Sequence, residues 1–321
     1  MRYDVFNGDA DGICALHQLR LEEPKPDAEL VTGVKRDIRL LDRLVEKVGG
    51  GDEITVLDVS MDSNKDSLKR ILSFGCRVFY VDHHFSGEIP ESSFLSAQID
   101  PNPDVCTSLI VDRLLAGRYR AWAVAAAFGD NLHDAARKSA QSLSLGEEQI
   151  SVLRELGELM NYNGYGASID DLHLAPQELY KAVRPFDDPL AFYNESPVLA
   201  RLRTGYASDM ENAGQQNVQH VGAIGRIFYF PAEPWSKRVA GVYSNEKARE
   251  KPEMAHALLV DNGNGTYMAS VRAPLQRKKG ADDLCRKFPT GGGRAAAAGI
   301  NALPEEMLDD FLGSFREVFS T

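Results

Sequence analysis

The sequence predicts an α/β fold: an N-terminal parallel sheet with helices on both faces, followed by a smaller C-terminal α/β domain. The 321 residues, 43% hydrophobic and 26% charged, have the composition of a globular protein and enough length for two domains. The first hundred residues alternate β-rich runs with amphipathic helical runs, a rhythm typical of parallel strands joined by crossover helices. A second β-rich region follows a polar stretch, which indicates a separate domain.

The N-terminal elements follow from this alternation. Strands are expected at Arg2–Phe6, Glu29–Val34, Glu53–Asp58 and Arg77–Asp82. Helices are expected between them at Gly12–Glu23, Asp37–Val48 and Ser63–Phe74, and after them at Thr107–Leu115, Ala121–Phe128 and Glu147–Tyr162.

The C-terminal elements follow a polar segment at residues 196–221, which contains Gly205, Gly214 and Gln215-Gln216 and is weakly helical only over Pro197–Arg203. We interpret it as a linker between domains at residues 1–195 and 222–321. Beyond it we expect strands at Ile224–Phe230, Ala255–Val260 and Thr266–Val271, a helix at Asp282–Lys287, a Gly-rich turn, and a helix at Pro304–Phe319.

Composition excludes several classes of protein. The longest apolar run, Ala121–Phe128, is far shorter than the roughly 20 residues that cross a bilayer. The N-terminus meets acidic residues at once and lacks the pattern of a secretory signal. The four cysteines form no CxxC pair, which favours buried thiols over disulfides or a zinc site. We therefore expect a cytoplasmic protein with no membrane partner.

Charge separates the two halves of the chain. The formal net charge is -11, which argues against a surface that tracks long polyanions. Residues 1–221 hold 22 basic and 35 acidic side chains, whereas residues 222–321 hold 14 and 12. Most acidic residues of the first half are expected to form a solvated surface, but several aspartates follow predicted strands.

These aspartates fall where parallel strands end, which is the edge of an open α/β sheet at which ligands bind. Asp9 and Asp11 follow the first strand, Asp58 ends another, and Asp82-His83-His84 ends the next. Asp130 follows the Ala-rich helix. Taken singly, Asp11 is better explained as the N-cap of a helix, and Asp58 as a residue that caps the loop after its strand. Three consecutive metal-competent side chains after a buried strand are more specific.

In their order, these motifs resemble those of the DHH phosphoesterases, a superfamily of RecJ-type exonucleases, nanoRNases, cyclic-dinucleotide phosphodiesterases and family II pyrophosphatases. The four N-terminal motifs are Asp9-Ala10-Asp11-Gly12, Leu57-Asp58, Asp82-His83-His84 and Gly129-Asp130. Near the C-terminus, residues 291–299 read GGGRAAAAG and resemble the GGGHxxAAG signature of the DHH-associated substrate-binding domain.

Five carboxylates and two imidazoles in one cleft require cations, and oxygen-rich ligation suits Mn²⁺ or Mg²⁺. The resemblance implies two ions, an arrangement suited to in-line displacement at phosphorus. One would lie on Asp11, Asp58, His83 and Asp130, and the other on Asp9 with Asp58 as a bridge. It also implies that Asp82 orients the histidines or the nucleophile and that His84 contacts phosphate.

Two positions depart from the family pattern. Many relatives have a histidine four residues before the first aspartate, where this chain has Val5. An ion on Asp9 is therefore expected to bind weakly unless Asn7 compensates. Arg294 replaces the histidine of the C-terminal signature, which keeps a bidentate phosphate donor but removes a group that titrates near neutrality.

The C-terminal half carries the expected phosphate contacts. Arg272 resembles a strand arginine with which relatives clamp a nucleotide phosphate, and Arg294 is expected to act with it. Gly291, Gly292 and Gly293 would let backbone amides approach an anion, and the alanines after Arg294 either pack tightly or open a helix toward it.

These observations predict a metal-dependent phosphodiesterase that hydrolyses very short oligonucleotides or linear dinucleotides to mononucleotides. The alternatives are a RecJ-like exonuclease on longer single-stranded DNA or RNA and an inactive nucleotide-binding module. The modest charge of the C-terminal half disfavours the first, and the retained aspartates and histidines disfavour the second. No long nucleic acid is expected as a partner, and a homodimer is left open.

Overall fold

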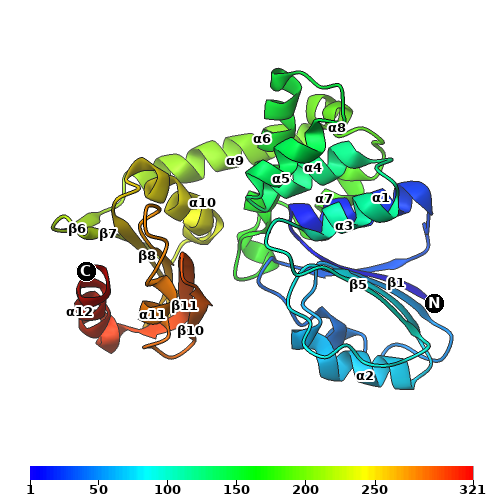
Figure 1. Ribbon diagram of the computed structural model, residues 1–321, viewed down its shortest axis with the longest axis horizontal. Helices are drawn as coiled ribbons and strands as arrows, with labels where there is room; N and C mark the ends of the chain where they lie inside the picture. The colour runs from blue at the N-terminus through cyan, green and yellow to red at the C-terminus, as the bar shows by residue number, and fades with distance from the viewer. Residues whose placement is uncertain (321) are drawn as a thin grey trace. The chain divides into compact units, whose positions relative to one another are not determined.

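The computed structural model describes residues 1–320 and divides into two compact units, residues 1–204 and residues 205 onward (Figure 1). Each unit has its own sheet. No helix within residues 1–320 combines the length and apolarity needed to cross a bilayer. All four cysteines are buried and have free thiols, as the sequence predicts.

The first unit is built on a sheet whose described strands are all parallel, in the order β2-β1-β3-β4-β5. The strands are β1 (Arg2–Asn7), β2 (Glu29–Gly33), β3 (Glu53–Leu57), β4 (Arg77–Asp82) and β5 (Leu95–Ile99). The predictions of the first four are confirmed. Strand β5 was not predicted, because its five residues alternate at the edge of the sheet without a long apolar run.

Helices cover both faces of this sheet, which confirms the predicted fold class (Figure 1). Helices α1 and α3 pack on one face, and α2 lies on the other. The helices of the first unit are α1 (Ala10–Glu22), α2 (Lys65–Ser73), α3 (Thr107–Leu114), α4 (Arg120–Gly129), α5 (His133–Ala140), α6 (Glu147–Gly164), α7 (Pro176–Val183) and α8 (Pro189–Glu195), with 3-10 turns at Leu40–Arg43, Asp62–Asn64 and Ile169–Asp171.

The helix expected over Asp37–Val48 is wrong, because only Leu40–Arg43 forms a 3-10 turn. The apolar residues of this segment nevertheless pack in the core beneath the sheet, so their spacing serves burial without a full helix. The Asn64 side chain accepts a hydrogen bond from the Leu41 amide (3.1 Å) and donates to the Ile38 carbonyl (2.5 Å). These contacts satisfy backbone groups that helical turns would otherwise pair.

Helix α9 (Pro197–Gly214) occupies most of the segment that we interpreted as a linker. It extends well beyond Arg203, where the weak helical pattern ends, and it includes Gly205. The division between the two units falls after residue 204, inside this helix. The polar residues of the segment therefore belong mainly to a helix.

The second unit contains a mixed sheet in the order β10-β11-β9-β8-β7-β6. Only the β7–β8 pair is parallel among its described strands, and α10 (Pro234–Glu250) connects the two. Helices α11 (Ala281–Cys285) and α12 (Leu308–Phe319) pack on the apolar core of the sheet. The strands are β6 (Val218–Val221), β7 (Gly225–Phe230), β8 (Ala255–Asp261), β9 (Thr266–Arg272), β10 (Gly291–Arg294) and β11 (Ala297–Pro304).

The Gly-rich segment forms strand β10, so the expected turn at this position is wrong. A Cβ on Gly291 would lie 1.8 Å from the Cys285 carbonyl oxygen, and Gly293 has φ 138°, which favours glycine. The alanines that follow turn into β11 instead of opening a helix, and Ala298 is the buried one among them. Gly291 and Gly293 are thus required by close packing within the second unit, whereas a Cβ on Gly292 would meet open space.

Candidate metal centre

The predicted aspartates meet at the carboxyl ends of the central strands. Strand β1 lies between β2 and β3, so the chain reverses its direction across the sheet at the β1/β3 boundary, where ligands of open α/β sheets bind. Asp9 follows β1 and Asp58 follows β3 at this boundary. Asp9, Asp11 and Asp58 are each at most 3% exposed. Buried carboxylates at such a position require compensation of their charge.

Asp11 is held by the beginning of α3. The backbone N–H groups of Thr107 and Ser108 donate to its two carboxylate oxygens, both at 2.7 Å, and the Ser108 hydroxyl donates to its carbonyl. Asp9, not Asp11, is the N-cap of α1. Burial and the neighbouring charge of Asp130 raise the pKa of Asp11, while the amide of Ser108 opposes this shift.

Asp58 adopts a backbone conformation that is uncommon for residues other than glycine, with φ 57°. Its Oδ1 accepts a hydrogen bond from the Thr107 hydroxyl (3.4 Å) and lies 3.4 Å from Nε2 of His83. Burial raises the pKa of Asp58 well above its ordinary value, and the charges of Asp11 and Asp9 add to the shift. Strained residues of this kind concentrate at functional sites.

His83 presents Nε2 to the carboxylates because its other ring nitrogen is engaged. Nδ1 donates to the Val105 carbonyl at 2.8 Å, and Nε2 lies 3.8 Å from Asp130 Oδ2. Burial opposes the charged imidazole, but the hydrogen bond to Asp58 and the surrounding carboxylates raise the pKa of His83 to about 10. Without a metal ion, a proton on His83 thus partly balances the aspartates. A carbonyl-anchored imidazole of this type is the usual form of a metal-ligating histidine.

Asp82 contacts both histidines, the ring of His84 and the backbone of His83. It is fully buried, and its Oδ1 accepts hydrogen bonds from Nδ1 of His84 (2.7 Å) and from the backbone amide of His83 (2.9 Å). The His84 side chain is 44% exposed, so its ring remains accessible for a ligand.

Two groups of side chains have the spacing of metal ligands. Asp11, His83 and Asp130 form one group, and Asp58, His83 and His84 form the other, with the ligand atoms of each group within 4.8 Å of one another. Carboxylate oxygens with one or two imidazole nitrogens suit Mn²⁺ or Mg²⁺. The residues present therefore fit a divalent cation.

The sequence reasoning missed Lys35, whose ammonium lies beside the aspartates. Its Nζ donates to Asp9 Oδ2, to Asp130 Oδ1 (3.0 Å) and to Asn161 Oδ1 (2.9 Å). Burial alone would raise the pKa of Asp9, but Lys35 holds it below its ordinary value. Asp9 belongs to neither ligand group among the described residues.

A sequence signal for Lys35 existed. It follows β2 by two residues, so the rule that identified Asp9 and Asp58 also applies to it. Asn161 carries no such signal, because it is one polar residue within a long helix, and only the packing of α6 brings it to the site.

The predicted phosphate-binding residues share a row in the second sheet. Arg294 pairs with Ala297, Ala297 with Arg272, and Arg272 with His256 on successive strands. Opposed residues of neighbouring strands lie on the same face, so Arg272 and Arg294 are separated by one strand, a spacing of about 10 Å. Nε of Arg272 donates to Asn245 (2.7 Å), whereas Arg294 is exposed. Gly291, Gly292 and Gly293 lead to Arg294 on the same strand.

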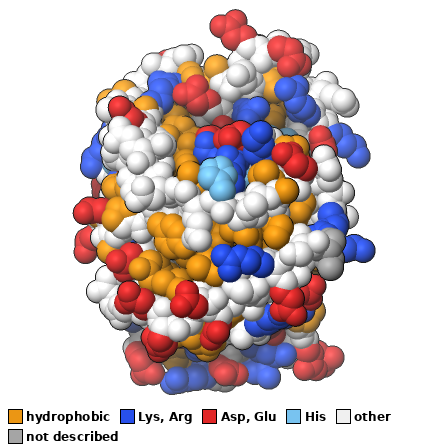
Figure 2. All heavy atoms as spheres, turned by 90° about the vertical axis from the view of Figure 1, so that its left-hand side faces the viewer, with side chains coloured by type: hydrophobic (Ala, Val, Ile, Leu, Met, Phe, Trp, Pro, Cys, Tyr) orange, Lys and Arg blue, Asp and Glu red, His pale blue; other side chains and the backbone are white. Residues whose placement is uncertain are grey.

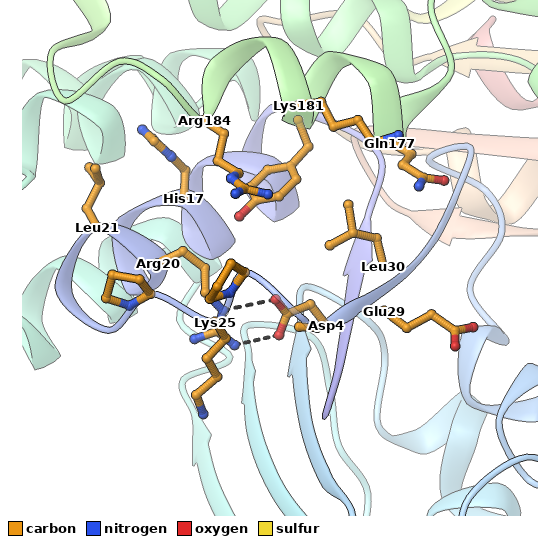
Figure 3. A pocket seen from close by; sticks show the side chains of 14 residues that line it. Asp4, His17, Arg20, Leu21, Lys25, Glu29, Leu30, Gln177, Lys181 and Arg184 are labelled. Carbon is orange, nitrogen blue, oxygen red and sulfur yellow. Dashed lines mark hydrogen bonds and ion pairs between the residues drawn. The ribbon is translucent and has the colours of Figure 1, made fainter. Parts of the chain in front are cut away.

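A separate pocket of about 640 Å³ lies at the opposite end of the first sheet (Figure 3). It is lined by residues near the beginning of β1 and β2 and by α1 and α7, and it includes Arg20, Lys25, Lys181 and Arg184. Arg20 is engaged there by Asp4, as the dashed lines of Figure 3 mark. None of the predicted site residues lines this pocket.

No protein-family model and no curated protein matches the sequence. Solved structures do match, and they define the class of fold. A DHH-domain protein described as belonging to a family of ribosomal proteins has a TM-score of 0.66 at 12% identity, over 98% of this chain and 85% of its own. The chain thus has the fold of DHH-domain proteins.

Two further structures are particular enzymes of this fold. The exonuclease RecJ bound to manganese gives a TM-score of 0.62 at 16% identity, over 99% of this chain and 90% of its own. The pGpG-specific phosphodiesterase PggH of Vibrio cholerae gives 0.56 at 14% identity, over 99% of both chains. These similarities confirm the DHH-domain part of the resemblance, whereas the C-terminal substrate-binding domain stays a prediction.

Proposed function

We propose that the protein is a DHH phosphoesterase that hydrolyses very short oligonucleotides or linear dinucleotides with Mn²⁺ or Mg²⁺. The observation that carries the proposal is the pair of ligand groups at the β1/β3 boundary, Asp11 with His83 and Asp130 and Asp58 with His83 and His84, which share His83. This set occurs in a fold shared with a manganese-bound exonuclease and with a dinucleotide phosphodiesterase.

The roles of the residues follow from their contacts. Asp11, Asp58, His83 and Asp130 would hold the cation, which when bound would act as a Lewis acid toward a phosphate ester. Asp82 would fix His84 through the 2.7 Å hydrogen bond to Nδ1, which leaves Nε2 of His84 available for a ligand. The partly exposed His84 would then contact the substrate phosphate.

The C-terminal unit would bind substrate phosphates through Arg272 and Arg294. Their common row places two guanidinium groups on one face of the second sheet. On the face of this unit that Figure 2 shows, basic and acidic side chains are interspersed around apolar ones and form no extended basic track. A local pair of arginines supports a short substrate better than a polymer, which needs such a track.

The deciding experiment compares chain lengths. The catalytic efficiency on 5′-phosphorylated dinucleotides is measured beside that on chains of about ten or more nucleotides, at fixed salt and with Mn²⁺ or chelator. We expect faster hydrolysis of dinucleotides, a shallow salt dependence and complete loss with chelator. The Asp58→Asn variant is the matched inactive control.

Two other outcomes have distinct meanings. Faster cleavage of long chains with a steep salt dependence would identify a RecJ-like exonuclease, which the fold similarity to manganese-bound RecJ makes the second candidate. Binding of nucleotides without hydrolysis by Mn²⁺-loaded protein would identify an inactive nucleotide-binding module.

A further inference from the structure

The Lys35 ammonium has the surroundings of a bound cation. An ammonium group carries three N–H donors and no acceptor. Within residues 1–320, Nζ of Lys35 has three oxygen partners, on Asp9, Asp130 and Asn161. The donors and the acceptors therefore match in number. The Lys35 side chain is 23% exposed, so this ammonium lies largely out of water among charged oxygens.

The backbone of Lys35 is fixed from two sides. Its amide donates to the Gly164 carbonyl at the end of α6 (2.9 Å), and its carbonyl accepts from the Asn7 side chain (3.3 Å). The ammonium also lies 5.5 Å from the centre of the Tyr165 ring. Contacts to β1 and α6 thus hold the side chain toward Asp9, which distinguishes Lys35 from a solvated surface lysine.

Asp9 differs from Asp11 in having an ammonium on one of its carboxylate oxygens. Oδ1 accepts from the backbone amides of Asp11 (3.0 Å) and Gly12 (3.2 Å), and Oδ2 accepts from Lys35. A divalent ion on Asp9 would share this carboxylate with an ammonium that is hydrogen-bonded to Oδ2, and like charges repel strongly in a buried site. The other aspartates have no such competitor, apart from the single oxygen of Asp130 that faces Lys35.

We propose that Lys35 is the second cation of this centre and that the site binds one divalent ion, on Asp11, Asp58, His83 and Asp130. This inference rests on the proposed function for the nature of the site, and it replaces the two-ion arrangement that the resemblance implies. A covalently attached charge cannot dissociate when metal is scarce. Activation by Mn²⁺ should consequently follow a single binding isotherm with no cooperativity.

The test counts bound ions. Chelator-stripped protein is titrated with Mn²⁺, and free Mn²⁺ is followed by electron paramagnetic resonance. The wild type is expected to bind one ion per chain, and so is Lys25→Met, a control that removes a lysine from the opposite end of the sheet. Lys35→Met removes the ammonium while retaining side-chain length, and it is expected to bind two ions with the spectrum of a spin-coupled pair.

A second variant keeps Lys35 and tests Asp9 directly. Asp9→Asn should leave the count at one, whereas a centre that uses Asp9 as a ligand would lose an ion. Two ions in the wild type, or one ion in folded Lys35→Met, would overturn the assignment of Lys35 and leave the proposed function intact. No bound Mn²⁺ in the wild type would overturn both.

Discussion

The two ends of the five-stranded sheet both bury charge, but only one end is balanced. At the amino end, Arg20 donates to both oxygens of Asp4 (2.9 and 2.5 Å) and to the Thr55 hydroxyl (2.9 Å). At the carboxyl end, four aspartates face one lysine and one histidine. The first arrangement is a complete ion pair, whereas the second has an excess of negative charge.

This difference distinguishes the structural ion pair at the amino end from the functional charges at the carboxyl end. A buried pair with all its hydrogen bonds satisfied needs no ligand, although breaking it is costly. An unbalanced cluster raises the pKa of its carboxyl groups, as burial and the neighbouring aspartates do for Asp58. Carboxylates in that condition gain most from a cation. The balance of charge, more than the number of charged residues, therefore identifies the site in this protein.

The largest effect is expected at the unbalanced end. Asp58→Asn and His83→Ala should each lower kcat/KM by about 10³-fold or more, because each removes a ligand of the cation. Asparagine tolerates the positive φ of Asp58, so the fold should persist. Asp58→Asn should leave the stability of the metal-free protein equal or slightly higher because it removes one of several like charges, whereas His83→Ala should lower it because it removes a counter-charge of the aspartates. Mn²⁺ should raise the Tm of the wild type but not of either variant. Near wild-type turnover at saturating Mn²⁺ would refute the ligand assignment.

Substitutions at the balanced end should change the stability of the protein and not its turnover. Arg20→Met leaves the Asp4 carboxylate buried without its partner, and we expect a loss of about 3–5 kcal/mol in the free energy of unfolding. Turnover of the folded variant at low temperature should be unchanged. The double variant Arg20→Met with Asp4→Leu should recover much of the loss, since it leaves no unpaired charge. Urea unfolding measures both, and a drop in turnover without a loss of stability would contradict the structural role.

The pH dependence of stability tests the amino end of the sheet further. His17 is 1% exposed, and its Nε2 donates to the Phe186 carbonyl at 2.7 Å. Burial lowers the pKa of His17 to about 4 in the folded protein, while the unfolded chain has the ordinary value of about 6.5. The unfolded state therefore binds more protons between these values, and stability falls as pH drops from about 6.5 to about 4.

The expected loss from His17 is about 3 kcal/mol. His17→Gln keeps a donor for Phe186 but cannot titrate, so its stability should fall less over the same pH range. The difference between wild type and variant removes the contribution of other groups, such as His256, whose pKa burial also lowers to about 4. The free energy of unfolding is measured with urea at pH 7 and at pH 4.5. An equal loss between these pH values in the wild type and in His17→Gln would exclude His17 as the source.

The smallest effects are expected in the second unit, where residues 222–321 hold 14 basic and 12 acidic side chains. Arg272→Ala and Arg294→Ala should each weaken substrate binding by about 1.5–3 kcal/mol through loss of a charge-assisted phosphate contact. Metal content should not change, because neither residue belongs to the ligand groups. Arg294→His should retain activity if this position only contacts phosphate. Michaelis constants and turnover equal to those of the wild type would remove both arginines from the substrate site.

Much of the centre was accessible from the sequence because local order places it there. A strand followed directly by a polar residue delivers that residue to the carboxyl edge of a parallel sheet, which located Asp9, Asp58 and Asp82-His83-His84. Strands β1 to β4 were predictable because short β-rich runs alternate with amphipathic helical runs, the rhythm of parallel strands joined by crossover helices. The helix over Asp37–Val48 failed because the same apolar residues reach the core from a loop that Asn64 holds in place.

By itself, the sequence determined the fold class, the strand ends and the residue types that can bind a cation, because these depend on periodicity and on chain order. Only the tertiary structure decided which carboxylates have an ammonium beside them and which are left for that cation. The α3 amides hold Asp11, the α1 amides and Lys35 use both oxygens of Asp9, and α6 brings Asn161 to the ammonium. These contacts join residues up to 126 positions apart in the sequence, so no local pattern encodes them.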